Sequence, residues 1–317
     1  MRILGLILLT LPVCVNAAIY DVDNRQETLL EADSRYQQIA RSVPTLLPSD
    51  RVIKSGDGYQ LQGPTLEKNF KMCPDAKFAR QKIIGNCTGA LIGEDKVLTA
   101  AHCISNHSGE SDCHRYSVVF DYQLKTSADD ESNYQVDKES VFRCKKILKY
   151  DFDGVAGMDM AIIQLDRKVV GRSILKVAKT KPQISDRLYI IGYPLGIFQK
   201  VADDGVVTSH RPSSQAFRHN LDAFSCNSGS PIFSEQTDEI VGVHVRGTGP
   251  NVEEYNNLGC RDWYKATPST TDENGKQVLG DFDEANYAHL LQNLPSYKSQ
   301  PRKPRRKHKK RVKRKKL

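Results

Sequence analysis

The chain has 317 residues, 39% of them hydrophobic, and a formal net charge of +8 from 46 basic and 38 acidic residues. This hydrophobic content is sufficient for a buried core and excludes a generally disordered chain. The charge is uneven, because residues 298–317 hold 13 Lys or Arg and no acid, which leaves 33 bases and 38 acids in the rest of the chain. A mildly acidic body with a basic tail excludes a nucleic-acid platform that covers the whole surface.

The first 17 residues predict a secretory signal peptide. Arg2 supplies a positive charge, an apolar run follows from Ile3 to Val15, and Val15-Asn16-Ala17 has small residues at the usual cleavage positions. The apolar run is shorter than the roughly 20 residues that span a bilayer. We therefore expect the protein to be secreted or periplasmic.

Cysteine content fits an oxidising compartment. Of eight cysteines, seven remain after removal of the signal peptide, namely Cys73, Cys87, Cys103, Cys113, Cys144, Cys226 and Cys260. An odd number allows at most three intramolecular disulfides, and spacing alone does not choose among the connectivities.

Beyond the signal peptide, the composition divides the chain into three parts. Residues 18–60 are polar and irregular, and they are expected to be either a removable pro-segment or an N-terminal extension. A folded domain is expected over 61–295. In residues 281–294 the apolar positions lie close to helical spacing and predict one amphipathic helix. The polybasic tail, 296–317, is of low complexity and is expected to be disordered.

The central part of the chain predicts an all-β fold. Short apolar or alternating runs are separated by turn signals, which is typical of many short strands in a barrel or sandwich. Seven examples are Thr88–Ile92, Lys96–Ala100, Ser117–Tyr122, Val141–Leu148, Met160–Leu165, Leu188–Gly192 and Ile240–Val245.

Three short motifs in this region contain a histidine, an aspartate and a serine, in that order. They read Leu98-Thr99-Ala100-Ala101-His102-Cys103, Asp159-Met160-Ala161-Ile162-Ile163-Gln164-Leu165 and Asn227-Ser228-Gly229-Ser230-Pro231. Each motif alone has an ordinary structural explanation, such as a cap or a turn. Together they resemble the chymotrypsin-like (trypsin-like) serine peptidases, and Gly242-Val243-His244 resembles a run of the bacterial glutamyl-endopeptidase branch. The resemblance covers about residues 73–265 and implies two packed antiparallel six-stranded β-barrels with a C-terminal helix.

The resemblance also implies a catalytic triad. A serine hydroxyl is a poor nucleophile at neutral pH and requires an adjacent base. His102 would be that base and later the acid that protonates the leaving amine. Asp159 would hold the imidazole in the correct tautomer. Ser228 is the expected nucleophile, because it is the first serine of its motif and Ser230 occupies a glycine position.

The oxyanion of the tetrahedral intermediate must be stabilised by preorganised donors, and the resemblance assigns them to the backbone N–H groups of Cys226 and Ser228. Cys226 replaces the usual glycine, and a side chain is tolerated there only if the turn avoids positive φ. Asn227 replaces the aspartate that would pair with a new N-terminus in trypsin. Activation by that route is therefore not expected. The resemblance implies no cofactor and no metal.

The family's histidine-loop disulfide implies a bridge between Cys87 and Cys103. Cys113 and Cys144 bracket an acidic loop between two predicted strands, and we expect them to pair. A Cys73–Cys260 bridge would then join the ends of the domain, and Cys226 would be the cysteine outside the three disulfides. The alternative is a bridge between Cys226 and Cys260.

Primary specificity stays open between basic residues and glutamate. Asp222 lies six residues before Ser228, where trypsin-like enzymes place the acid that binds Lys or Arg, and Gly247 matches a glycine that leaves the pocket open. His244 suggests the opposite preference, because the glutamyl-endopeptidase branch has a histidine there to receive Glu. Ala223 replaces the threonine of that branch, so we favour basic residues slightly.

The expected partners are protein or peptide substrates of a monomeric enzyme. The tail can also bind an anionic cell surface or another polyanion, but it has no aromatic residue for stacking and predicts no sequence-specific nucleic acid. A hypothesis of a different class is a catalytically silent relative that serves as a binding protein. The intact triad favours the enzyme.

Overall fold

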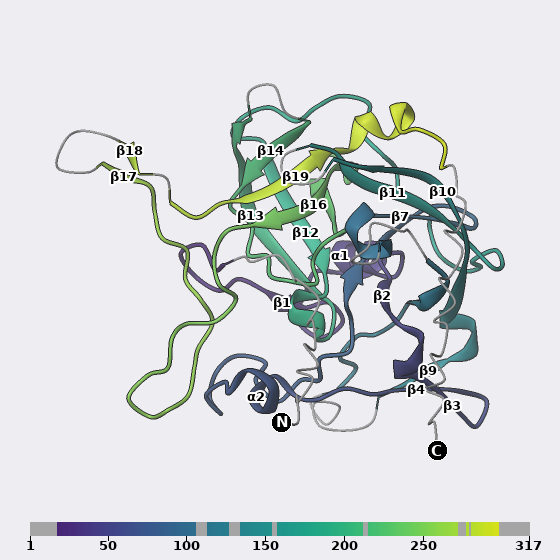
Figure 1. Ribbon diagram of the computed structural model, residues 1–317, viewed down its shortest axis with the longest axis horizontal. Helices are drawn as coiled ribbons and strands as arrows, with labels where there is room; N and C mark the ends of the chain where they lie inside the picture. The colour runs from purple at the N-terminus through teal and green to yellow at the C-terminus, as the bar shows by residue number, and fades with distance from the viewer. Residues whose placement is uncertain are drawn as a thin grey trace, which may run out of the picture.

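The structure is a computed structural model that describes residues 18–105, 113–126, 134–153, 157–211, 215–271, 277–278 and 280–297. The predicted signal peptide and residues 298–317 of the basic tail lie outside these ranges. Two seven-stranded antiparallel sheets dominate the molecule (Figure 1). The predicted all-β fold with two barrels is confirmed. None of the helices in the described ranges has the length and apolar character needed to cross a membrane.

The N-terminal barrel has the strand order β5-β2-β8-β10-β11-β7-β6. Its strands are β2 (Thr45–Pro48), β5 (Cys87–Thr88), β6 (Ala90–Gly93), β7 (Lys96–Thr99), β8 (Tyr116–Val119), β10 (Val141–Phe152) and β11 (Asp159–Leu165). Gly89 alone separates β5 from β6, and a Cβ on it would lie 2.6 Å from Val97 Cγ1. The strands β5 and β6 thus act as one bent strand that closes a six-stranded barrel.

The C-terminal barrel has the order β1-β13-β12-β15-β16-β19-β14, and β14 also pairs with β13. Its strands are β1 (Gln26–Glu27), β12 (Arg187–Gly192), β13 (Lys200–His210), β14 (Ala216–His219), β15 (Pro231–Ser234), β16 (Ile240–Gly247) and β19 (Asp283–Tyr287). The second pairing of β14 closes six of these strands into a ring. β1 adds an edge strand to β13.

Smaller elements surround the barrels. A three-stranded sheet contains β3 (Val52–Ser55), β4 (Gly58–Leu61) and β9 (Tyr134–Asp137), and a two-stranded sheet contains β17 (Thr270–Thr271) and β18 (Gln277–Val278). The α-helices are short, α1 (Ser34–Ala40) and α2 (Leu66–Phe70). The described 3-10 helices are Ser49–Arg51, Ala101–Ile104, Cys113–Arg115, Lys138–Ser140, Pro194–Gly196 and Ala288–Asn293.

Each of the seven predicted apolar runs overlaps a strand, because its side chains supply the buried faces of the barrels. One continuous hydrophobic cluster contains residues of both barrels, including Val97, Met160, Tyr193 and Phe233. Tyr122 and Phe198 add an aromatic contact across this region, with ring centroids 4.7 Å apart. The two barrels therefore share a core, which is what positions a site between them.

The predicted amphipathic helix over 281–294 is wrong. Asp283–Tyr287 form β19, between β16 and β14, and only Ala288–Asn293 are helical, as a 3-10 helix. The helical spacing of the apolar residues was misleading, since all five residues of the strand are buried, the polar ones included. Sheet pairing with two neighbouring strands outweighs the local helical period.

The domain boundary expected at residue 61 does not coincide with a boundary in the structure. β2 lies between β5 and β8 inside the N-terminal barrel, and β1 pairs with β13 of the C-terminal barrel. Val43, Leu46 and Leu47 are fully buried. Residues 18–60 are thus part of the folded body, which the polar composition of this stretch concealed.

Candidate active site

His102 and Asp159 are brought together by two neighbouring strands. His102 lies in the 3-10 helix that follows β7, and Asp159 is the first residue of β11, which pairs with β7. His102 Nδ1 lies 2.6 Å from Asp159 Oδ2, and the His102 backbone N–H donates to Asp159 Oδ1 at 2.9 Å. The Asp159 side chain is 4% exposed and that of His102 is 23% exposed. The carboxylate therefore holds the imidazole from the inside of the protein.

Asn286 fixes Asp159 in turn. The Asp159 backbone N–H donates to Asn286 Oδ1 at 2.9 Å, and Asn286 Nδ2 donates to the carbonyl oxygens of Gly157 and Gln215 at 3.3 and 3.2 Å. Sequence reasoning missed this residue, because it lies in β19, where a helix was predicted.

Ser228 lies in a tight turn that packs against the histidine segment. The turn is closed by the Ser230 N–H, which donates to Asn227 O at 2.8 Å. Gly229 has φ +86°, and a Cβ there would lie 2.4 Å from Thr99 Oγ1 and 2.9 Å from Ala100 N. Only glycine allows both the left-handed backbone and this close approach. Ser228 is thereby presented beside the segment that leads into His102.

Thr88 adds a second link between the two sides of the site. Its backbone N–H donates to Ser228 O at 2.9 Å, and its hydroxyl donates to Cys226 O at 3.1 Å. Thr88 O accepts from Thr99 Oγ1 at 2.7 Å. Sequence reasoning did not single out Thr88, although it follows the disulfide-bonded Cys87 directly.

The two serines of the motif have different surroundings. Ser230 is fully buried, and its hydroxyl donates to Asn227 Oδ1 at 3.4 Å. A Cβ on Gly192 would lie 2.1 Å from Ser230 Oγ, so this hydroxyl is packed against β12. Ser228 instead directly precedes Gly229, whose backbone approaches Thr99 and Ala100 of the histidine segment.

Cys226 has a positive φ, the condition that its side chain was expected to avoid. Its φ is +72°, within a turn closed by the Asn227 N–H, which donates to Phe224 O at 2.9 Å. Ser225 O accepts from the Leu195 N–H at 2.6 Å. Because C=O and N–H point in opposite directions across a trans peptide, the Cys226 N–H points away from Leu195. By the same geometry, the Ser228 N–H points away from the Ser230 amide.

The structure contains the three disulfides Cys73–Cys260, Cys87–Cys103 and Cys113–Cys144. Cys226 is buried and lies outside these three. Cys87, His102 and Cys103 are close enough to suggest a metal site, but both sulfur atoms belong to one disulfide and are not thiolate ligands.

Asp222 does not face an open pocket. Its Oδ1 accepts from the Tyr20 backbone N–H at 2.7 Å and its Oδ2 from the Asn24 N–H at 3.1 Å. The residue is 3% exposed. Burial raises the pKa of Asp222 to about 7, although the two amides and the charge of Arg25 oppose the shift. Both carboxylate oxygens are thus occupied by the N-terminal segment.

His244 and Gly247 lie against a second buried acid, Asp283, which the sequence did not reveal. Gly247 is the cross-strand partner of Asp283, and His244 Nε2 lies 3.7 Å from Asp283 Oδ1. Asp283 Oδ2 accepts from the Tyr20 hydroxyl at 2.9 Å. Burial lowers the pKa of His244 to about 3 and raises that of Asp283 well above its usual value.

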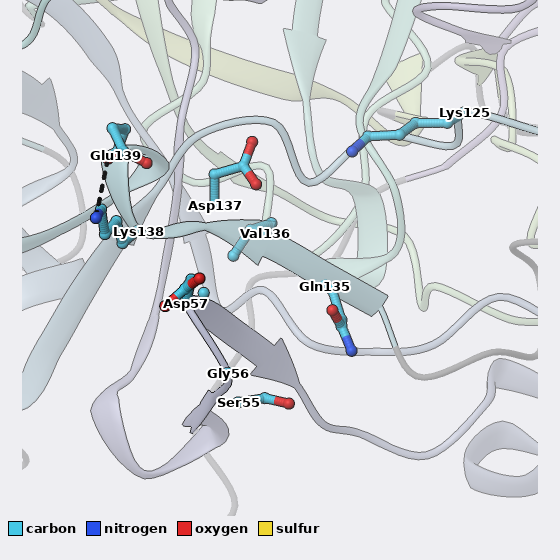
Figure 2. Close-up of a pocket in the computed structure, with 10 residues that line it drawn as sticks. Ser55, Gly56, Asp57, Lys125, Gln135, Val136, Asp137, Lys138 and Glu139 are labelled. Carbon is cyan, nitrogen blue, oxygen red and sulfur yellow. Dashed lines mark ion pairs between the residues drawn. The ribbon is translucent and has the colours of Figure 1, made fainter.

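A large polar hollow lies away from these residues. It is formed by the β3–β4 hairpin and β9, and it contains the carboxylates of Asp57, Asp137 and Glu139 together with Lys125 and Lys138 (Figure 2). Lys138 Nζ lies 3.8 Å from Glu139 Oε1. None of the triad residues lines this hollow.

Comparison with solved structures finds similar chains. A Glu endopeptidase in complex with MPD is 18% identical, with coverage of 85% of this chain and 93% of that chain and a TM-score of 0.47. The human heparin binding protein is 14% identical, with 86% and 94% covered and a TM-score of 0.46. The Vibrio cholerae VesB protease is 16% identical, with 85% of this chain and 65% of that chain covered and a TM-score of 0.45.

Sequence comparisons identify a known domain. No curated protein sequence matches the chain. Residues 87–243 match the model of the trypsin-like peptidase domain. This segment contains His102, Asp159 and Ser228 and includes strands of both barrels. The chain therefore contains a trypsin-like peptidase domain and has the chymotrypsin-like fold of two β-barrels.

Proposed function

We propose that the protein is a secreted serine endopeptidase that hydrolyses peptide bonds through Ser228, His102 and Asp159. The observation that carries this proposal is the double attachment of His102 to one buried carboxylate, through its ring at 2.6 Å and its backbone at 2.9 Å. Such an attachment selects the tautomer with hydrogen on Nδ1 and leaves Nε2 to act as a base. The packing of the Ser228 turn against Thr99 and Ala100 supports the same assignment.

In the proposed reaction, Ser228 Oγ attacks the scissile carbonyl carbon while His102 Nε2 takes the hydroxyl proton. The tetrahedral intermediate collapses to an acyl-enzyme as the imidazolium returns the proton to the leaving amine. Water then attacks the ester, with His102 again the base, and the carboxylic acid leaves. Asp159 stabilises the imidazolium in both halves and does not itself take the proton.

The backbone N–H groups of Cys226 and Ser228 are the proposed oxyanion donors. The carbonyl groups that precede them, Ser225 O and Asn227 O, are hydrogen-bonded within the protein. Each N–H therefore points away from those partners. Donors fixed in this way before the reaction stabilise the developing charge without reorganisation.

Labelling with a fluorophosphonate tests the triad. This probe forms a covalent bond with an activated serine, and we expect it to label the protein stoichiometrically. Labelling should disappear in Ser228→Ala, remain in the matched control Ser230→Ala, and slow by at least a hundredfold in His102→Ala. A folded protein that is not labelled would instead support the catalytically silent binding protein.

The expected location follows from the signal peptide and is supported by the three disulfides, which persist in oxidising compartments. There the basic tail would bind an anionic surface. We expect the full chain to bind a sulfated polysaccharide column and to elute with salt, whereas a chain ending at Tyr297 should flow through. Equal retention of both chains would assign the binding to the body.

A further inference from the structure

Tyr20 bonds to Asp222, one of the three residues predicted to form the substrate side-chain pocket, and to Asp283, an acid next to the other two. Its backbone N–H donates to Asp222 Oδ1 at 2.7 Å, and its hydroxyl donates to Asp283 Oδ2 at 2.9 Å. Asp283 is in turn the strand partner of Gly247 and lies 3.7 Å from His244. The tyrosine side chain thus extends from one buried acid to the other.

The segment that carries Tyr20 is anchored on its N-terminal side. The Ile19 N–H donates to Tyr264 O at 2.9 Å, and Ile19 O accepts from the Ala266 N–H at 2.8 Å. Ala18 and Ile19 are both buried. These contacts hold the backbone immediately before Tyr20.

Arg25 anchors the segment on the other side. It is fully buried, and its Nε and a terminal nitrogen donate to Asp23 at 2.8 and 2.6 Å. Its guanidinium carbon lies 3.9 Å from the ring centroid of Trp263 and 4.4 Å from that of Phe224. A buried cation held by a carboxylate and two aromatic faces is costly to displace. Tyr20 is therefore a fixed part of the site, and a substrate does not simply push it aside.

The position of Tyr20 decides which charges a substrate can meet. Both oxygens of Asp222 accept backbone amides, and Asp283 is fully buried. Asp283 Oδ1 has no hydrogen-bond partner within the described part of the chain, so an acid able to receive a cation is present but covered. The Tyr20 hydroxyl already occupies the other oxygen of this acid, Asp283 Oδ2.

We propose that Tyr20 is a specificity-determining residue that closes the bottom of the side-chain pocket and limits the residue before the scissile bond to glycine, alanine or serine. This inference rests on the proposed peptidase function. It replaces the basic preference that Asp222 alone suggested. It also predicts that removal of the ring converts the pocket into one for Lys and Arg.

The test uses peptide substrates that differ only in the residue before the scissile bond, Ala, Arg, Lys or Glu. Wild type should cleave the Ala substrate with the highest kcat/KM. In Tyr20→Ala the ratio of kcat/KM for Arg to that for Ala should rise at least tenfold, and in Tyr20→Leu by less. Tyr20→Phe keeps the ring and should keep the wild-type ratio. Tyr264→Phe is the matched control, because it removes only a tyrosine hydroxyl that bonds to the nearby Asp281 at 2.9 Å, and it should leave the ratio unchanged.

Two readouts separate the failure of this inference from the failure of the proposed function. Fluorophosphonate labelling at the wild-type rate shows that a variant is folded and that its triad is intact. Benzamidine binding, measured by calorimetry, requires no catalysis, and we expect it in Tyr20→Ala but not in wild type. Labelled variants with unchanged ratios, or a wild type that prefers Arg, would overturn the inference alone. Absence of labelling in folded wild type overturns the proposed function and this inference with it.

Discussion

Cys226 has a backbone conformation that normally belongs to glycine. Its φ of +72° lies in the left-handed region, at the turn that precedes the nucleophile. For a residue with a Cβ, this conformation costs about 1–2 kcal/mol. The strain persists because hydrogen bonds on both sides hold the turn, through Phe224 O and Cys226 O. A strained turn of this kind is consistent with a site whose amides are held in one direction.

Comparison of Cys226→Gly with Cys226→Ala isolates this strain. Both variants lose the buried thiol, but only glycine removes the Cβ penalty, so Cys226→Gly should be more stable by about 1 kcal/mol. Urea unfolding measures the difference. At Ala223, which is buried and is not among the positive-φ residues, Ala223→Gly should instead lower stability by about 0.5–1 kcal/mol. Equal stability of the two Cys226 variants would show that the turn relaxes around the side chain.

At the scale of single residues, sequence could predict the candidate triad and not the pocket. His102, Asp159 and Ser228 each lie in a motif whose neighbours are as characteristic as the residue itself. Tyr20 is an isolated tyrosine in a polar stretch, and it meets Asp222 across 202 positions of the chain. Pairing over such a distance leaves no local pattern, so only the fold reveals it.

Among the strands, β19 shows why a correct local pattern gave the wrong element. Its residue Glu284 is fully buried and accepts from three arginines, Arg211 at 3.2 Å, Arg218 at 3.3 Å and Arg246 at 2.8 Å. These arginines come from other parts of the C-terminal barrel and allow a polar residue to lie inside a sheet. A sequence window that includes only residues 281–294 does not contain them. Without these arginines, the polar positions of the window look like the solvent-facing side of a helix.

The edge strand β1 is attached by a buried ion pair. Lys200 Nζ, in β13, lies 2.8 Å from Glu27 Oε1, and Lys200 also donates to Gln81 Oε1 and Phe198 O at 2.8 Å. Burial lowers the pKa of Lys200 to about 8, and the attraction of Glu27 opposes the shift. The pair thus joins the N-terminal segment to the C-terminal barrel at a cost in desolvation.

Substitution of Lys200 tests both the attraction between Lys200 and Glu27 and the cost of burying the two charges. Lys200→Met leaves Glu27 buried without its cation and should destabilise the protein by about 3 kcal/mol at pH 7, whereas Lys200→Met/Glu27→Leu should recover most of the loss. The matched surface pair, Lys168 and Glu94 at 2.6 Å, is largely exposed, and Lys168→Met should have no measurable effect.

The same residue should contribute a pH dependence to stability. Between pH 8 and the ordinary lysine pKa of 10.5, the unfolded chain holds the proton that folded Lys200 has lost. Lys200 therefore makes the free energy of unfolding rise with pH through this window. Below pH 8, Lys200 is protonated in both states and adds no pH dependence. Urea unfolding from pH 7 to 10 measures the free energy of unfolding of wild type and of Lys200→Met. The excess stability of wild type over the variant should grow with pH. A difference that is constant with pH would contradict a lowered pKa.

On the scale of the whole molecule, the N-terminal segment connects the two barrels. It runs past Asp222 and Asp283, adds β1 to the C-terminal barrel, and then supplies β2 to the interior of the N-terminal barrel (Figure 1). The two-barrel plan was predictable from the alternating runs and the family motifs. The participation of residues 18–60 was not predictable. The short buried stretch Val43–Leu47 is flanked in the sequence by mainly polar residues, which hide its apolar pattern.

A chain that starts at Leu61 should therefore fail to fold. It lacks β2, which pairs with both β5 and β8, and the loss leaves two strand edges unpaired inside the barrel. Burial of a Val or Leu side chain contributes about 1.5–3 kcal/mol, so the loss of Val43, Leu46 and Leu47 removes about 5–9 kcal/mol, comparable to the whole stability of a typical domain. Near-UV circular dichroism, urea unfolding and fluorophosphonate labelling measure the outcome. A chain that starts at Ala18 keeps every contact in the described ranges and should unfold cooperatively. Cooperative unfolding and labelling of the shorter chain would show that residues 18–60 are a dispensable extension.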